Sequence, residues 1–216
     1  MAFIKVVSKT EANEQQREFY RKQQGGLDYL PNYAQVYVQR PEVMDTWVAL
    51  QSTLRGAMGS RLYSLVSLAA ALAIRSSYCA LAHARILMRN EFTGNEMVAV
   101  LTGTSGRPLS QGEWCAMVLA RKVARDTASL EPSDIRRLRD HGFSEQEIFD
   151  VVAAAAARCF FAKVPDALGV LPDDALADLG PELLQLLCLG RKPTRMPPQR
   201  EATVETAGEE KWLMYS

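Results

Sequence analysis

The chain has 216 residues, of which 48% are hydrophobic, and its 25 basic and 25 acidic side chains leave no formal net charge. This length and apolar content suffice for one compact domain with a sizeable core. A neutral chain has no overall field to attract nucleic acid or an anionic membrane, so we expect neither as a partner.

The first element predicted along the chain is a polar helix. Residues 3–7 could form a short extended arm, and Ser8 and Glu11 have the spacing of a capping box that opens a helix reaching about Gln24. Two glycines follow, so residues 1–26 are expected to form an N-terminal arm and helix. The apolar part of this segment is too short for a signal peptide.

Two helices with aromatic or apolar faces are predicted next. Tyr29, Tyr33 and Tyr37 recur every four residues, which favours packing in the core or between subunits over contact with a substrate. Pro41 suits the first turn of an amphipathic helix, which two glycines end after residue 55.

Residues 60–74 form the longest apolar run and predict a buried helix. Ser60, Ser64, Ser67 and Ala71 give it one face of small residues, which lets another helix approach closely. The same face could instead line a polar pocket, with Ser64 across a cleft from the next helix. The run is too short and too polar to cross a membrane.

The clearest chemical pattern opens the following helix. Ser76 or Ser77 would cap this helix, and Cys79 and His83 lie four residues apart on one face. The positive end of the helix dipole, together with His83 and Arg75, should favour the thiolate of Cys79 over the thiol. A thiolate is the reactive form, so we expect a reactive cysteine here.

Each of these residues also has a plainer interpretation. A free cysteine is often an inert core residue, and His83 could be a structural histidine. A zinc site needs three or four ligands, and the only other histidine, His141, lies in an apparent surface turn; we therefore expect no metal and no cofactor. The remaining cysteines lack such surroundings and are expected in the core as reduced thiols of a cytoplasmic protein: Cys115, Cys159 and Cys188.

Arginines near this pattern leave two alternatives open. Arg75, Arg85 and Arg89 place cations on or beside the same helix. They could form a solvated face, or they could recognise a carboxylate or a peroxide-bearing acid through the guanidinium fork.

The rest of the chain predicts further helices and a polar tail. A loop at 103–109 precedes helices ending near Thr127 and Gly142 and an alanine-rich helix at 145–163, whose alanines indicate tight packing rather than chemistry. Residues 173–190 hold a last amphipathic helix, expected from Asp173 to Leu187. Residues 191–216 are expected to be extended or disordered, with Trp212 docking on a neighbouring surface. No convincing strand is found, so the predicted class is all-α.

The pattern Ser76-x-x-Cys79-x-x-x-His83, after a helix of the form Arg-x-x-(polar)-Leu-Val, resembles the alkyl hydroperoxidase D and carboxymuconolactone decarboxylase family, in particular its peroxidase-related branch. Residues 106–170 continue the resemblance through the order of their elements and a closing D-A-L-G-V. The resemblance spans roughly residues 27–172 and implies an oligomeric, alkyl-hydroperoxidase-D-like helical bundle there.

Two positions depart from the family's active-site pattern. Members with peroxidase activity have Cys-x-x-Cys-x-x-x-His and a Glu one helix earlier; the second cysteine attacks the peroxide, the first is its disulfide partner, and Glu and His relay protons. Cys79 and His83 match the attacking cysteine and the relay histidine. Ser76 stands at the position of the partner cysteine and Ser64 at that of the Glu.

The resemblance and the residues lead to one main hypothesis and two alternatives. An antioxidant-type thiol oxidoreductase would reduce a small peroxide at Cys79, form a sulfenic acid and be restored by an external thiol; His83 would bind or deprotonate the thiol, and Ser76 would donate a hydrogen bond to it. Alternatively, the chain is a non-catalytic homo-oligomer with a binding or structural role. As a third interpretation, it is a carboxymuconolactone-decarboxylase-like lyase using the His83 region as acid and base.

Overall fold

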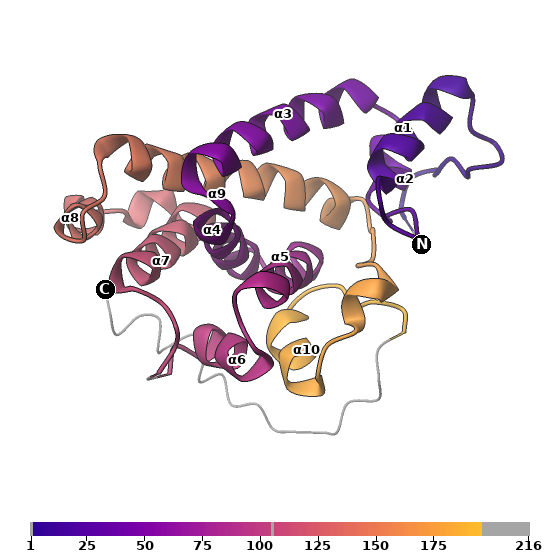
Figure 1. Cartoon of the computed structure of the whole chain (residues 1–216). Helices are drawn as coiled ribbons and strands as arrows, with labels where there is room; N and C mark the ends of the chain where they lie inside the picture. The colour runs from indigo at the N-terminus through magenta and orange to yellow at the C-terminus, as the bar shows by residue number, and fades with distance from the viewer. Residues whose placement is uncertain (1, 105, 196–216) are drawn as a thin grey trace.

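The computed structural model describes residues 2–104 and 106–195, and within these every regular element is a helix (Figure 1). The predicted all-α class is therefore confirmed. In chain order the elements are α1 Glu14–Gln24, α2 Ala34–Tyr37, α3 Pro41–Met58, α4 Ser60–Ala73, α5 Ser77–Asn90, α6 Gly94–Thr102, α7 Gln111–Arg125, η1 Thr127–Ser129, α8 Pro132–Asp140, α9 Glu145–Ala167, η2 Asp174–Ala177 and α10 Pro181–Leu187.

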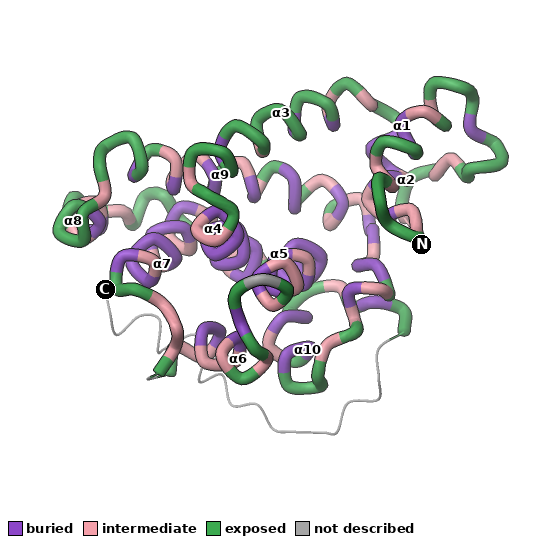
Figure 2. Tube along the Cα trace, viewed as in Figure 1, coloured by how far each residue is buried: buried purple, intermediate pink, exposed green. Residues whose placement is uncertain are grey.

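Helix α4 is the centre of the molecule. Every residue from Tyr63 to Leu72 is buried, because α4 packs against α3, α5, α7 and α9. Figure 2 shows this continuous burial along α4 and the exposed outer faces of α3 and α8. The expected small-residue face lies inside the core, where Ser64, Ser67 and Ala71 allow these close contacts.

Helices α5, α7 and α9 complete the core around α4. Serine caps both α7 and α9. The hydroxyls of Ser110 and Ser144 each accept a hydrogen bond from the backbone N–H of the glutamate three residues on, and the carboxylate of that glutamate accepts one from the backbone N–H of the serine. Helix α10 packs against α5 and α6 (Figure 1). The proposed division at residues 26, 172 and 190 stays a prediction.

Three expected elements in the N-terminal part of the chain differ from the observed ones. The first helix begins only at Glu14, because Asn13 and Gln16 form the capping box; Ser8 and Glu11 pair in a separate turn before it. Residues 3–7 form no strand. The tyrosine-rich segment is helical only over Ala34–Tyr37, although Tyr33 and Tyr37 do pack on Phe161, as expected for core residues.

The last expected helix is divided in two. A 3₁₀ turn covers Asp174–Ala177, and α10 begins at Pro181. Pro181 lacks the backbone N–H and disfavours helical geometry in the residue before it, which favours the start of a new helix at this position. The expected docking of Trp212 lies outside the described residues.

Among the described residues, no helix combines the length and the apolar character needed to cross a lipid bilayer.

Candidate functional site

The start of α5 carries the predicted cysteine and histidine. Ser76 is the N-cap residue, as predicted, but its side chain does not bond to the first turn of the helix. The Ser76 hydroxyl is buried and acts to lower the pKa of Cys79 and of Asp166, although its oxygen lacks a partner with good hydrogen-bond geometry. The Ser76 side chain therefore influences Cys79 and Asp166 and does not cap the helix.

The four residues expected to form the site are all buried. Cys79 is 3% exposed and His83 4% exposed on α5, and Ser64 lies inside α4. No hydrogen bond of the described chain joins Ser64 to Cys79 or His83. Tyr63, which precedes Ser64 on α4, does contact His83: the two rings lie edge-on with their centroids 6.0 Å apart.

The residue that sequence reasoning missed is Arg158. Its Nη1 lies 3.9 Å from the sulfur of Cys79, and its Nη2 donates a 3.0 Å hydrogen bond to the hydroxyl of Tyr63. The side chain is 3% exposed. A signal was present in the sequence, because Arg158 occupies a core-facing position of α9, in register with the buried residues Ile148, Val151, Ala155, Ala162 and Pro165.

Aromatic rings surround the Arg158 guanidinium. It lies over the rings of Trp47 at 5.1 Å, Phe161 at 5.5 Å and Tyr63 at 6.0 Å, and Trp47 and Phe161 are stacked on each other. We call Trp47, Tyr63 and Phe161 the aromatic collar. A cation over aromatic faces is stabilised by the ring quadrupole, most strongly where water is excluded.

The arginines expected near the site point elsewhere. Arg75 is exposed and donates to the backbone oxygen of Leu189. Arg85 donates to the backbone of Ala175, and Arg89 is exposed. The cation beside Cys79 therefore comes from α9, far along the chain, and not from these three positions.

The electrostatics correct a second expectation. Burial raises the pKa of the Cys79 thiol, and Arg158 and Ser76 only partly offset this effect. In this structure the thiol is thus favoured over the thiolate, contrary to the prediction from the helix start. Removing water destabilises the charged sulfur more than its neighbours stabilise it.

His83 is held as a neutral imidazole. Burial, reinforced by the positive charges of Arg158 and Arg55, brings the pKa of His83 well below its usual value. Its Nδ1 atom is buried without a hydrogen-bond partner. A neutral imidazole with a free nitrogen can accept a proton or bind a polar group that enters the site.

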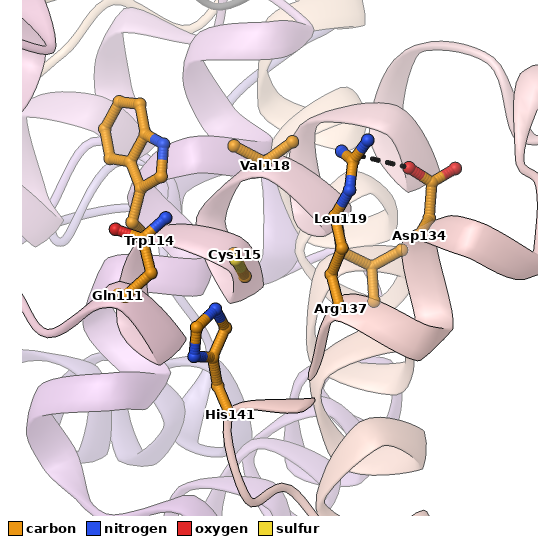
Figure 3. A pocket seen from close by; sticks show the side chains of 8 residues that line it. All are labelled: Gln111, Trp114, Cys115, Val118, Leu119, Asp134, Arg137 and His141. Atoms are coloured by element: carbon orange, nitrogen blue, oxygen red, sulfur yellow. Dashed lines mark ion pairs between the residues drawn. The ribbon is translucent and has the colours of Figure 1, made fainter. Parts of the chain in front are cut away.

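A second place where a thiol, an arginine and a histidine meet is the cavity between α7 and α8 (Figure 3). It has a volume of about 260 Å³. Burial raises the pKa of Cys115, with Arg137 opposing the shift. The cavity is lined by Gln111, Trp114, Cys115, Val118, Leu119, Asp134, Arg137 and His141.

Neither place offers a metal centre. Within the described chain, no group of three histidine, cysteine, aspartate or glutamate side chains is arranged to hold a metal ion. Cys79 and His83 therefore have no third ligand there.

Comparison with known proteins finds a family match over part of the chain. Residues 41–126, which include Cys79 and His83, match the carboxymuconolactone decarboxylase family. No curated protein matches the chain.

Solved structures with the same fold are similar over more of the chain than the family match is. A peroxidase-related protein with an alkylhydroperoxidase AhpD core from Ralstonia eutropha JMP134 has a TM-score of 0.70 and 20% identity, covering 81% of this chain and 94% of its own. A peroxidase-related protein from Silicibacter sp. TM1040 has a TM-score of 0.70, 17% identity and coverages of 82% and 95%. The debrominase Bmp8, in complex with 2,3,4-tribromopyrrole, has a TM-score of 0.68, 17% identity and coverages of 86% and 100%.

Proposed function

This chain carries a carboxymuconolactone decarboxylase family domain in an AhpD-like fold, and from that premise we propose that it is a single-cysteine thiol oxidoreductase that reduces peroxides at Cys79. The contact between the Cys79 sulfur and the Arg158 guanidinium, 3.9 Å apart and shielded from water, is the observation that supports this function. A buried guanidinium favours the thiolate and can also donate to a leaving oxygen.

The reaction proceeds through a sulfenic acid. The Cys79 thiolate attacks the outer oxygen of the hydroperoxide, the O–O bond breaks, and an alkoxide leaves and takes up the proton given up by the thiol. An external thiol then condenses with the sulfenic acid, releasing water and forming a mixed disulfide. A second external thiol reduces this disulfide and restores Cys79.

The neighbouring residues take supporting roles. His83 accepts the thiol proton at its unpartnered Nδ1 and passes it to the departing oxygen. The Ser76 hydroxyl acts to lower the pKa of Cys79, but a serine cannot form a disulfide with it. Ser64 leaves the carboxylate position of the relay unfilled, so His83 works here as a neutral acceptor.

Oligomerisation and a reducing compartment complete the proposal. Val48 on α3, and Phe149 and Phe160 on the adjacent α9, are 42%, 69% and 48% exposed, and a second copy of the chain would cover them. Light scattering that gives a 24 kDa monomer at micromolar concentration would contradict this assembly. All four cysteines are free thiols, which suits the cytoplasm.

Trapping of the sulfenic acid tests the function directly. The folded protein is treated with mild organic hydroperoxide and a dimedone-type probe, and each of the four cysteines is quantified by mass spectrometry. We expect the adduct at Cys79, and we expect peroxide consumption with an external thiol to fall to background in Cys79→Ser but not in Cys115→Ser. Both replacements change a buried thiol to a hydroxyl, so they are matched.

The other outcomes distinguish the alternatives. No adduct at Cys79 and no turnover under any reductant would replace the enzyme with a binding or structural oligomer. Turnover of a lactone acid that is unaffected by Cys79→Ser would indicate the lyase.

A further inference from the structure

Arg158 is a buried cation that has no carboxylate partner in the described part of the chain. It is 3% exposed, and none of the ion pairs among the described residues involves it. Burying an unpaired charge is costly, because the water that stabilised it is lost. Buried arginines are usually paired, so the absence of an ion pair at this guanidinium calls for an explanation.

The donors of this guanidinium are only partly used. Nη1 faces the Cys79 sulfur and Nη2 the Tyr63 hydroxyl, but the buried Nε has no partner. The buried Nδ1 of His83 is also unpartnered. Guanidinium presents its donors in one plane, in a fork that matches a carboxylate or a similar oxyanion.

Planar aromatic rings lie around the positively charged guanidinium of Arg158. The stacked rings of Trp47 and Phe161, 5.0 Å apart, lie beside the guanidinium, and Tyr37 also stacks on the Phe161 ring at 5.5 Å. Such surfaces accept a planar ring more readily than a flexible chain.

We propose that the site formed by Cys79, Arg158 and the aromatic collar binds a planar aromatic monoanion, whose anionic group bonds to Arg158 and whose ring packs against Trp47 and Phe161. The reacting atom of such a ligand lies at the Cys79 sulfur. The binding stands on its own, and only its use as the substrate rests on the proposed function.

Helix α3 is the element that opens to admit this ligand. Of its 18 residues, Met44, Trp47 and Leu54 are the buried ones, and Trp47 is the collar residue it contributes. Separating α3 from α9 therefore exposes Arg158 while the contacts of α4 with α5 and α7 remain. Elements with few buried side chains open at the smallest free-energy cost.

A rival explanation is that Arg158 serves only as the counter-ion of the Cys79 thiolate. Two alkylating agents separate the two roles, because iodoacetate is an anion and iodoacetamide is its neutral analogue. Both need the thiolate, so the ratio of their rates at one cysteine does not depend on the thiolate fraction. The ratio at Cys79, read by mass spectrometry, reports whether the site attracts an anionic ligand.

We expect the iodoacetate to iodoacetamide ratio at Cys79 to fall about tenfold in Arg158→Gln, as befits the loss of a charge-assisted hydrogen bond, and to be largely restored in Arg158→Lys. Arg137→Gln, in the α7–α8 cavity, is the matched control and should leave this ratio unchanged. An equal ratio in wild type and Arg158→Gln would overturn the anion site.

Competition in the wild-type protein tests the ligand class without any substitution. Benzoate should slow iodoacetamide labelling of Cys79 at lower concentrations than acetate, and the neutral benzamide should not slow it. Equal protection by benzamide would overturn the anionic part, and equal protection by acetate the aromatic part. If benzoate protects Cys79 but no peroxide is consumed, the binding site stands and the proposed enzyme fails.

Discussion

Cys79 on α5 and Cys115 on α7 each lie in a helix near an arginine and a histidine. The two cysteines differ in their access to solvent and in the partners of their arginines. Cys79 is enclosed, and its arginine lacks an ion-pair partner among the described residues. Cys115 lines an open cavity of about 260 Å³. Burial raises the pKa of both thiols.

The difference lies in what each arginine already contacts. Arg137 is 4.0 Å from the carboxylate of Asp134 (Figure 3), and Lys122 bonds to the same carboxylate at 2.8 Å. An arginine that faces a carboxylate favours a nearby thiolate less, since the two charges offset each other. A cavity beside a cysteine is thus weaker evidence for thiol chemistry than a buried cation beside a buried cysteine.

The largest effect should come from removing the two arginines separately. In Arg158→Met, the Cys79 thiolate loses its closest cation, so the pKa of Cys79 should rise by about one pH unit or more. Iodoacetamide labelling of Cys79 near pH 7.5 should then be about tenfold slower. The measurement is the pH profile of labelling, resolved by cysteine.

Arg137→Met is the matched change and should move the profile of Cys115 far less. An equal shift at both cysteines would mean that the carboxylate of Asp134 does not distinguish the two places. Circular dichroism should show both variants folded before the profiles are compared.

The second prediction concerns access. In the wild-type protein at neutral pH, neutral iodoacetamide should label the partly exposed Cys159 and the cavity-lining Cys115 several-fold faster than Cys79. Cys79 must wait for an opening of the structure. This order reverses the expectation from sequence, and labelling of Cys79 first would restore it.

The sequence predicts the local part of the site and misses the distant part. Ser76, Cys79 and His83 could be placed because helix capping and the four-residue repeat operate within one segment. Arg158 lies 79 residues from Cys79 along the chain. Its contact follows from how α9 packs on α4, and no local pattern encodes that packing.

The same reason explains the error in the thiolate prediction. The helix start and the nearby histidine are visible in the sequence, whereas the loss of water around Cys79 depends on the packing of α4, α5 and α9. Desolvation is the largest influence on the pKa of Cys79. Likewise, the fold class follows from periodicity, but the break before Pro181 needed attention to one residue.

The third prediction compares the histidines of the two places. His83 is kept neutral in the folded protein, while in the unfolded chain it takes up a proton below about pH 6.5. Its contribution to stability is therefore present above that pH and is lost as the pH falls below it. The loss is at most about 1.4 kcal/mol of unfolding free energy per pH unit.

Urea unfolding between pH 5 and 7 measures this effect. The difference in stability between wild type and His83→Asn should shrink as the pH falls, and contributions of other groups cancel in that difference. His141→Asn, at an exposed position beside the cavity, is the control for replacing a histidine elsewhere in the chain. A constant difference for His83→Asn would mean that this histidine is charged in the folded state.

The smallest effect is expected from a contact that only the Cys79 site has. Residues 188–191, which we call the C-terminal strap, join the start of α5 to the end of α9. The backbone N–H of Gly190 donates to the hydroxyl of Ser77 at 2.8 Å, and Arg191 donates to the backbone oxygen of Asp166 at 3.3 Å. The strap therefore ties together the helices that supply Cys79 and Arg158.

Gly190→Ala should loosen this strap. A methyl group at position 190 would lie 2.2 Å from the backbone oxygen of Arg75, and Arg75 already holds a left-handed backbone at φ 59°, so neither side can yield without moving the strap. Opening of the site then costs less, and iodoacetamide labelling of Cys79 should rise about two- to fivefold, while labelling of Cys115 stays as it was.

Gly26→Ala, where nothing lies within 4 Å of the added carbon, is the control and should change neither rate. A parallel rise at Cys79 and Cys115 would indicate general loss of stability, and unchanged labelling at both would show that the site opens on the side of α3 without the strap.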